Sequence, residues 1–228
     1  MYESIRPWLD RHGPSACFVQ TFLANGGEVV EAADNALVLY QKGSDTLFAL
    51  GDFTDNALIH SAGTVMTDRK DWFDERMMSG EYDDALIARN AVLLGEAHTI
   101  DVPEGAYIRP LTMHDLPFLV EHYAGFGTDE AYLIRCIERG MLGIGENGSL
   151  AGFIGTHPEG AMGLLHILPQ YRRKHYAQAL ESALIRRLQA QERFIWCQVE
   201  EDNTASWSLQ KRLGLVPAEL YYWLFRKP

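Results

Sequence analysis

The segment from Leu164 to Ala177 constrains the fold most, because it reads as a buried strand, a turn and a helix start in quick succession. The apolar run ends at Pro169, a helical pattern begins at Tyr176, and the loop between them holds three cations, Arg172, Arg173 and Lys174. Free backbone N–H groups and the dipole at a helix start attract anions. The segment therefore predicts an anion site suited to a pyrophosphate. The alternative, a merely solvated first turn, is disfavoured because cations there oppose the dipole.

Apolar periodicity and turn residues predict alternating strands and helices along the rest of the chain. In the first half we expect a helix over 14–23, strands over 29–33, 36–41 and 46–50, and helices over 68–78 and 82–95. In the second half we expect strands over 107–111, 141–145, 150–156, 161–168, 194–199 and 221–225. Helices are expected after the cap residue Thr112 and over 130–139, 176–193 and 204–213. Asn147-Gly148 is typical of a two-residue hairpin. The fold class is thus α/β (α+β).

The net charge of −11 lies entirely in the first half, where residues 1–104 hold 18 Asp and Glu against 7 Lys and Arg. The change in charge coincides with a linker that contains Pro103 and Gly105. Such an asymmetry favours two units, an acidic α/β domain over 1–104 and a second domain over 105–228. Because polyanion binding needs a basic surface, we expect no nucleic-acid partner.

Three cysteines, Cys17, Cys136 and Cys197, are far apart and odd in number, which favours free thiols in a cytoplasmic protein. No apolar run approaches the length of a membrane span, and no secretory signal is visible at the start, so we expect no membrane contact. No zinc-type Cys spacing occurs, and the even spacing of His157, His166 and His175 spans different elements, so we expect no metal site.

Two segments resemble the GNAT superfamily of N-acetyltransferases. Residues 172–177 stand where the family has Arg/Gln-x-x-Gly-x-Gly/Ala, the acyl-CoA-binding segment. Residues 203–215 are similar to its Asn-x-x-Ala/Ser-x-x-Leu-Tyr-x-Lys-x-Gly-Phe, and the order of elements over 107–228 also matches. The flanking sequence looks most like the branch of glycine N-acyltransferase-like proteins. The resemblance implies a central mixed, splayed sheet flanked by helices, preceded by a smaller α/β domain.

The resemblance also implies a site for acetyl-CoA or another short acyl-CoA. The parallel strands 161–168 and 194–199 would splay apart to admit the pantetheine arm, and a backbone N–H of the first would stabilise the oxyanion. The cofactor-binding residues would be Ile167 and Leu168 on the strand, Arg172, Arg173, Lys174, His175, Tyr176 and Ala177 around the pyrophosphate, and Asn203 and Ser206 beside the pantetheine. Asn203 is also placed to cap a helix, and both roles can coexist.

Two positions depart from the family pattern. His175 replaces a loop glycine, and because His is enriched at positive φ the loop can still form, with His175 either a phosphate ligand or a tolerated surface residue. Gln210 replaces a tyrosine that protonates the leaving thiolate in many members. An amide cannot act as a general acid, so protonation would fall to water or to another tyrosine. The tyrosines available in this half are Tyr176, Tyr221 and Tyr222.

The general base is harder to assign, because relatives often carry Glu or His where this chain has Ala161 and Gly163. Glu159 is the first candidate, directly or through a water, and His157 is the second. His166 is the third, but it has the opposite strand parity from 161 and 163 unless a bulge reverses it. Packing is therefore our interpretation of His166.

These residues predict an acyl-CoA-dependent N-acyltransferase that transfers acetyl from acetyl-CoA to a primary amine of a small molecule or peptide, by direct attack in a ternary complex. The alternative is a catalytically weak acyl-CoA-binding regulatory module with the acidic half as effector surface. Residues 1–104 could be a degenerate copy of the fold, a lid over the acceptor site or the surface of a homodimer. In the family, acceptor specificity comes from the first helices, here around Phe126–Tyr132.

Overall fold

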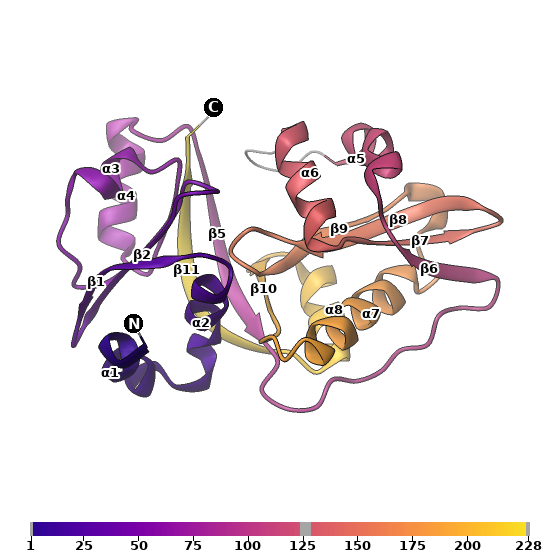
Figure 1. The fold of residues 1–228 in the computed structure, drawn as a ribbon, viewed down its shortest axis with the longest axis horizontal. Coiled ribbons are helices and arrows are strands. Elements are labelled where there is room, and N and C mark those ends of the chain that lie inside the picture. The colour runs from indigo at the N-terminus through magenta and orange to yellow at the C-terminus, as the bar shows by residue number, and fades with distance from the viewer. Residues whose placement is uncertain (1, 124–128, 227–228) are drawn as a thin grey trace.

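The computed structural model of the chain describes residues 2–123 and 129–226 (Figure 1). Their strands form one sheet in the order β1-β2-β3-β4-β11-β5-β10-β9-β8-β7-β6. The strands are β1 (Glu28–Ala33), β2 (Ala36–Gln41), β3 (Thr46–Gly51), β4 (Thr64–Thr67), β5 (Asp84–Val92), β6 (Ala106–Pro110), β7 (Leu142–Glu146), β8 (Ser149–Thr156), β9 (Met162–Ile167), β10 (Trp196–Glu200) and β11 (Val216–Phe225). The α-helices are α1 (Tyr2–His12), α2 (Cys17–Ala24), α3 (Ala57–Ser61), α4 (Lys70–Ser79), α5 (Leu116–His122), α6 (Glu130–Arg139), α7 (Tyr176–Ala190) and α8 (Thr204–Leu213).

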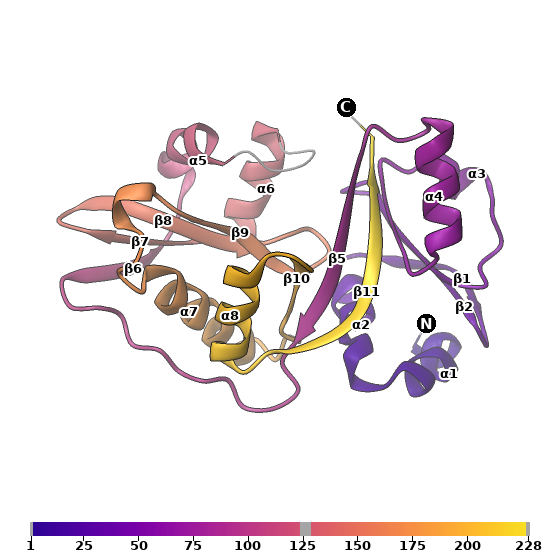
Figure 2. The same cartoon turned by 180° about the vertical axis from the view of Figure 1, so that it is seen from behind.

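The sheet is mixed, as expected for the fold class. Among the described strands, β3 pairs with β4 in parallel and β9 pairs with β10 in parallel, while the other neighbours are antiparallel. Helices α5 and α6 cover one face of the β6–β9 region, and α7 and α8 cover the other (Figures 1 and 2). Helices α1 and α2 lie on one side of β1–β4, and α3 and α4 lie on the other.

Strands β5 and β11 join the two halves of the sequence. β11 pairs with β4 on one edge and with β5 on the other, and β5 also pairs with β10. Both long strands stand between the N-terminal elements and the β6–β9 region (Figure 1). Backbone hydrogen bonds therefore connect the two predicted domains, 1–104 and 105–228, within one sheet.

The helix expected over 82–95 is wrong, because residues 84–92 form strand β5. Ala, Leu and Arg favour a helix in isolation, but tertiary context overrides such weak preferences. Here β10 and β11 satisfy both edges of the strand, and its buried end packs Ala88, Asn90 and Val92 into the interior. Three elements were not predicted at all: α1, α3 and β4.

Local signals in the second half are confirmed. The hairpin between β7 and β8 turns through Asn147 and Gly148, whose φ angles are 51° and 81°, as the two-residue turn requires. Thr112 and Asp115 form a reciprocal capping box at the start of the next helical segment.

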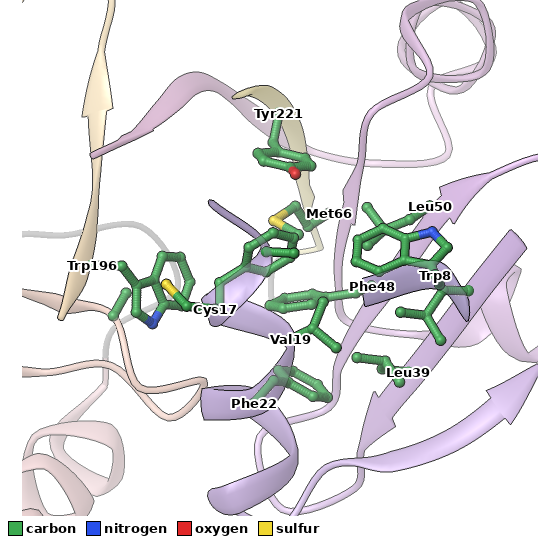
Figure 3. Packing of buried hydrophobic residues seen from close by; sticks show 14 of the residues in the cluster. Trp8, Cys17, Val19, Phe22, Leu39, Phe48, Leu50, Met66, Trp196 and Tyr221 are labelled. Carbon is green, nitrogen blue, oxygen red and sulfur yellow. The ribbon is translucent and has the colours of Figure 1, made fainter. Parts of the chain in front are cut away.

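Four buried clusters hold the helices on the sheet. The cluster under α1 and α2 is rich in aromatic rings and includes Phe22, Phe48 and Trp196 (Figure 3). Trp196 comes from β10 and its ring lies 5.7 Å from that of Phe18 on α2. Apolar packing therefore connects the halves as well, because α2 belongs to the acidic half and β10 to the other. None of the helices within 2–123 and 129–226 is long and apolar enough to cross a membrane.

Candidate active site

Strands β9 and β10 diverge after one point of contact. They are parallel neighbours, but their register holds a single pair, Met162 with Cys197. A cavity of about 240 Å³, here called the gap cavity, opens where they part. Its walls include Gly163 and Leu164 from β9 and Gln198 from β10. The divergence that the resemblance implies is therefore present.

A bulge in β9 accompanies the divergence. Leu164 has a φ of 55°, and β9 carries one extra residue opposite β8, because Phe153 faces His166 while Gly155 faces Gly163. A non-glycine residue at positive φ is uncommon, and bulges redirect side chains close to functional sites. The extra residue reverses the strand parity, so His166 shares a face with Gly163.

His166 nevertheless serves packing. Its ring stacks on Phe153 at 5.5 Å between centroids and also faces His122, and it lines neither of the cavities described here. Partial burial, followed by the nearby positive charge of Arg172, lowers the pKa of the imidazole. Both observations agree with the interpretation of His166 as a packing residue.

A second cavity, of about 650 Å³ and here called the large cavity, adjoins the gap cavity. Four residues line both: Tyr123, His157, Gln198 and Ser206. The acidic half contributes one wall, which includes Asp45, Thr46, Ser61 and Thr64. Of the segment 126–132 expected to select an acceptor, Tyr132 lines this cavity, whereas Phe126 lies outside the described residues.

Glu159 and His157 reach these cavities from the turn between β8 and β9. Glu159 is 6% exposed and lines the large cavity. His157 lines both cavities, and its Nδ1 is hydrogen-bonded to the hydroxyl of Tyr132. Burial raises the pKa of the Tyr132 phenol far above its ordinary value, so that phenol stays neutral. When Nδ1 carries the imidazole hydrogen, it donates to the Tyr132 oxygen and Nε2 is free to accept a proton.

The basic loop precedes the start of α7, as the sequence predicts. His175 caps α7 in the left-handed conformation with a φ of 61°, which is the conformation its family glycine would take. Arg173 also has positive φ, at 63°. Lys174 pairs with Glu146 at 2.7 Å, and Arg172 donates from Nε to the Ile167 carbonyl at 3.2 Å. The loop cations are exposed, and Ala177 follows in the first turn of the helix.

The backbone of β9 offers Ile167 to the divergence. Leu168 donates its N–H to the Ala151 carbonyl on β8, at 2.9 Å. In an antiparallel ladder alternate residues bond to the same neighbour, so the backbone groups of Ile167 point away from β8 and toward the divergence. The N–H of Leu168 is engaged within the sheet, and the Ile167 carbonyl accepts from Arg172, so the Ile167 N–H is the group that faces the divergence.

Asn203 and Ser206 lie at the start of α8, on the β10 side of the divergence. The side chain of Asn203 accepts from the Ser206 N–H at 3.0 Å, which is the expected capping bond. Both residues line the large cavity, and Ser206 lines the gap cavity as well. Capping and lining therefore coexist at Asn203.

None of the three tyrosines considered as a proton donor lines the gap cavity. Tyr176 is buried and its hydroxyl is bonded to Glu146, and burial raises its pKa to about 12. Tyr221 and Tyr222 belong to buried clusters around β11. The tyrosine that does line the cavity among the described residues is Tyr123, whose pKa burial raises to about 12.

A buried carboxyl group that the sequence did not single out lies in the gap cavity. Glu181 on α7 is 2% exposed and accepts a hydrogen bond from Gln210 Nε2 at 2.9 Å. Burial raises its pKa to about 7. The signal was available, because Glu181 interrupts the buried stripe of α7 between Leu180 and Leu184. A glutamate is rarely buried on the apolar face of a helix without a cationic partner.

Comparisons with known proteins agree with this architecture. Residues 141–224 match the model of the family described as FR47-like protein. No curated protein matched the chain in sequence. Within 2–123 and 129–226, no cluster of three or more His, Cys, Asp or Glu side chains has the arrangement of a metal site.

Solved structures share the fold over nearly the whole chain. A Drosophila protein aligns at a TM-score of 0.75 with 14% identity, covering 99% of this chain and 95% of its own. A GCN5-related N-acetyltransferase-like protein from Streptococcus suis aligns at 0.61 with 13% identity, covering 99% and 100%. A GCN5-related N-acetyltransferase from Kribbella flavida aligns at 0.54 with 12% identity, covering 94% of each chain. The glycine N-acyltransferase-like branch stays a prediction. The chain therefore has the fold of these GCN5-related N-acetyltransferase structures, and its residues 141–224 match the FR47-like family model.

Proposed function

We propose that the protein is an acyl-CoA-dependent N-acyltransferase that transfers acetyl from acetyl-CoA to a primary amine. The observation that carries the proposal is the divergence of β9 from β10 after the Met162–Cys197 pair, with a cavity inside it. A thioester arm placed there would have Gly163 and Leu164 of β9 on one side and Ser206 on the other.

The loop before α7 supports binding of the nucleotide end of the cofactor. The helix start directs backbone N–H groups outward, and Arg172, Arg173 and Lys174 surround it with positive charge. Lys174 is already paired with Glu146, so Arg172 and Arg173 are the cations we expect to contact the phosphates most directly. His175 supplies the turn geometry and a ring nitrogen for a further contact.

The large cavity is the proposed acceptor site. It meets the gap cavity at His157 and Ser206, so an amine bound in it would approach a thioester from the side of β10. The acidic half forms one of its walls, and its field would favour a cationic amine. We propose Glu159 as the first base for the ammonium proton, directly or through a water, and His157 as the second.

The chemistry needs positioning, a base and an oxyanion donor. The free amine attacks the thioester carbonyl and the N–C bond forms while negative charge moves to the carbonyl oxygen. A backbone N–H at the bulge around Leu164 is the proposed donor to that oxygen. The C=O bond then re-forms, the C–S bond breaks with its electron pair on sulfur so that the CoA thiolate leaves, and the second proton of the attacking nitrogen passes to solvent.

The test is release of free CoA thiol from acetyl-CoA over a panel of small amines, polyamines, amino acids and peptides. Thermal melting with CoA and acetyl-CoA is measured alongside. Turnover with an amine supports the enzyme. A rise in melting temperature with either ligand, without turnover of any acceptor, would support the alternative hypothesis of a regulatory module that binds acyl-CoA. Absence of a shift with either ligand would contradict both.

A further inference from the structure

Glu181 and Gln210 form a buried pair at the position where many members of the family have a tyrosine that protonates the leaving thiolate. Gln210 stands at the family's tyrosine position, and its Nε2 donates to Glu181 Oε1 across the space between α8 and α7. Glu181 Oε2 and Gln210 Oε1 have no hydrogen-bond partner among the described residues. Both side chains line the gap cavity. A buried carboxyl oxygen without a hydrogen-bond partner lowers the stability of the fold, so a functional role for Glu181 is a natural hypothesis.

Within the described part of the chain, no positively charged side chain affects Glu181 enough to hold it ionised. On β10, Cys197 faces it as a buried neutral thiol. On β7, Glu146 is occupied by Lys174 and Tyr176, and on β9 His166 lies on the opposite face of the sheet. The other titratable side chains in the gap cavity are His157 and Tyr123. Burial accordingly raises the pKa of Glu181 to about 7, so the neutral acid is well populated near neutral pH.

We infer that Glu181, oriented by Gln210, is the acid that protonates the departing CoA sulfur. The inference rests on the proposed acyltransferase function and assigns a catalytic residue to it. Because Gln210 donates to Oε1, the proton of the neutral carboxyl resides on Oε2, the oxygen without a partner. Gln210 cannot donate a proton in place of tyrosine, but it holds a group that can.

In this step Glu181 gives its proton to the departing sulfur. The C–S bond of the tetrahedral intermediate breaks and its electron pair moves to sulfur. The O–H bond of Glu181 breaks as the S–H bond forms, which gives the CoA thiol and the Glu181 carboxylate. Solvent returns a proton to Glu181 after the products leave. An alkyl thiol has a pKa of about 8.5, so transfer from an acid with a pKa near 7 is favourable.

A binding experiment isolates contact between Glu181 and sulfur without turnover. The affinities for CoA and for desulfo-CoA, which lacks the thiol, are measured by calorimetry from pH 5.5 to 8.5 for the wild type and for Glu181→Gln. A carboxylate accepts a thiol hydrogen more strongly than a neutral carboxyl does. The wild-type preference for CoA over desulfo-CoA is therefore expected to grow several-fold with a midpoint near pH 7. In Glu181→Gln the preference is expected to be flat.

Turnover gives the second readout. In the wild type, kcat should fall above about pH 7 as the acid ionises. Glu181→Gln should lower kcat by about 100-fold, flatten that limb and leave the KM for acetyl-CoA within about threefold. Glu138→Gln, which changes an exposed carboxylate on α6, is the control and should match the wild type.

The outcomes separate the two claims. Two results overturn the inference about Glu181 and leave the proposed function standing. One is CoA binding by the wild type with a preference over desulfo-CoA that does not change with pH. The other is a wild-type pH profile of kcat in Glu181→Gln. If Tyr123→Phe and not Glu181→Gln removes the alkaline limb, the donor is Tyr123 and the inference is wrong. Absence of CoA binding at every pH overturns the proposed function and this inference with it.

Discussion

The ring of His157 occupies the space that a side chain at Gly163 would need. A Cβ on Gly163 would lie 2.1 Å from His157 Nε2, closer than any real contact. Position 163 is one where relatives often carry the base on the strand itself. In this chain the missing side chain at 163 makes room for an imidazole that enters from the preceding turn, supported by Tyr132.

We expect Gly163→Ala to displace His157 and lower kcat by about tenfold or more, with the KM for acetyl-CoA within about threefold. The measurement is steady-state thiol release with the best amine of the panel, and His157→Ala is assayed beside it. Gly95→Ala is the control, because a Cβ there meets nothing within 4 Å. Wild-type turnover in both Gly163→Ala and His157→Ala would remove His157 from the list of bases.

Glu159→Gln should lower turnover at neutral pH by about 100-fold if Glu159 takes the ammonium proton, while acetyl-CoA affinity stays close to that of the wild type. The amide keeps the size of the buried side chain and removes its basicity. Initial rates and calorimetric affinity are compared with those of Glu138→Gln. Unchanged rates would exclude Glu159 and leave His157 as the candidate.

Arg172→Ala combined with Arg173→Ala should weaken CoA binding by about tenfold at low salt, because each cation can make a charge-assisted bond to phosphate. The difference from the wild type should shrink as salt rises, since screening weakens exposed charges. Calorimetry at several salt concentrations measures this. Arg6→Ala with Lys70→Ala removes the same charge from the acidic half and should have little effect; an affinity loss independent of salt would argue against a phosphate contact.

Glu181→Gln should also change stability in a way that depends on pH. The pKa of Glu181 is raised from 4.5 to about 7 in the folded state, so between these values the unfolded chain releases a proton that the folded chain keeps. The wild type therefore loses stability as pH rises through that window, by about 3 kcal/mol in total. Urea unfolding should show the variant about equal to the wild type at pH 4 and clearly more stable at pH 8. A constant difference at the two pH values would contradict a raised pKa.

Trp196→Ala should cost about 3–5 kcal/mol of unfolding free energy, the usual range for removing a fully buried aromatic side chain. The ring packs against Phe18 of α2, so its loss opens a cavity where the halves meet. Circular dichroism during urea unfolding measures the change. Phe194→Ala, nearby in sequence but 48% exposed, should cost much less; equal costs would mean that the aromatic cluster contributes little.

Signals that depend on a few adjacent residues could be predicted from the sequence. The hairpin at Asn147-Gly148, the positive φ of His175 and the cap at Asn203 are each set by local backbone chemistry. The divergence of β9 from β10 came from the resemblance rather than from local chemistry. Together these signals predicted where the proposed cofactor-binding part of the candidate site lies.

Features that depend on distant partners could not be predicted in this way. The local sequence of β5 predicts a helix, but the segment forms a strand because β10 and β11 supply hydrogen bonds on both of its edges. The large cavity is lined by residues of both the acidic half and α6, which no local pattern brings together. The sequence permits a bulge in this strand but does not place it, and the pairing with β8 shows that it lies near Leu164.

The position of β11 has a consequence for synthesis on the ribosome. This strand follows all the other described strands in the chain, yet it lies between β4 and β5 and completes both. A nascent chain that has not yet released residues 216–225 exposes two open strand edges, which are sites of misassembly. The acidic half precedes β11 in the chain but cannot close its sheet until β11 emerges, and its high negative charge would keep unfinished chains apart until then.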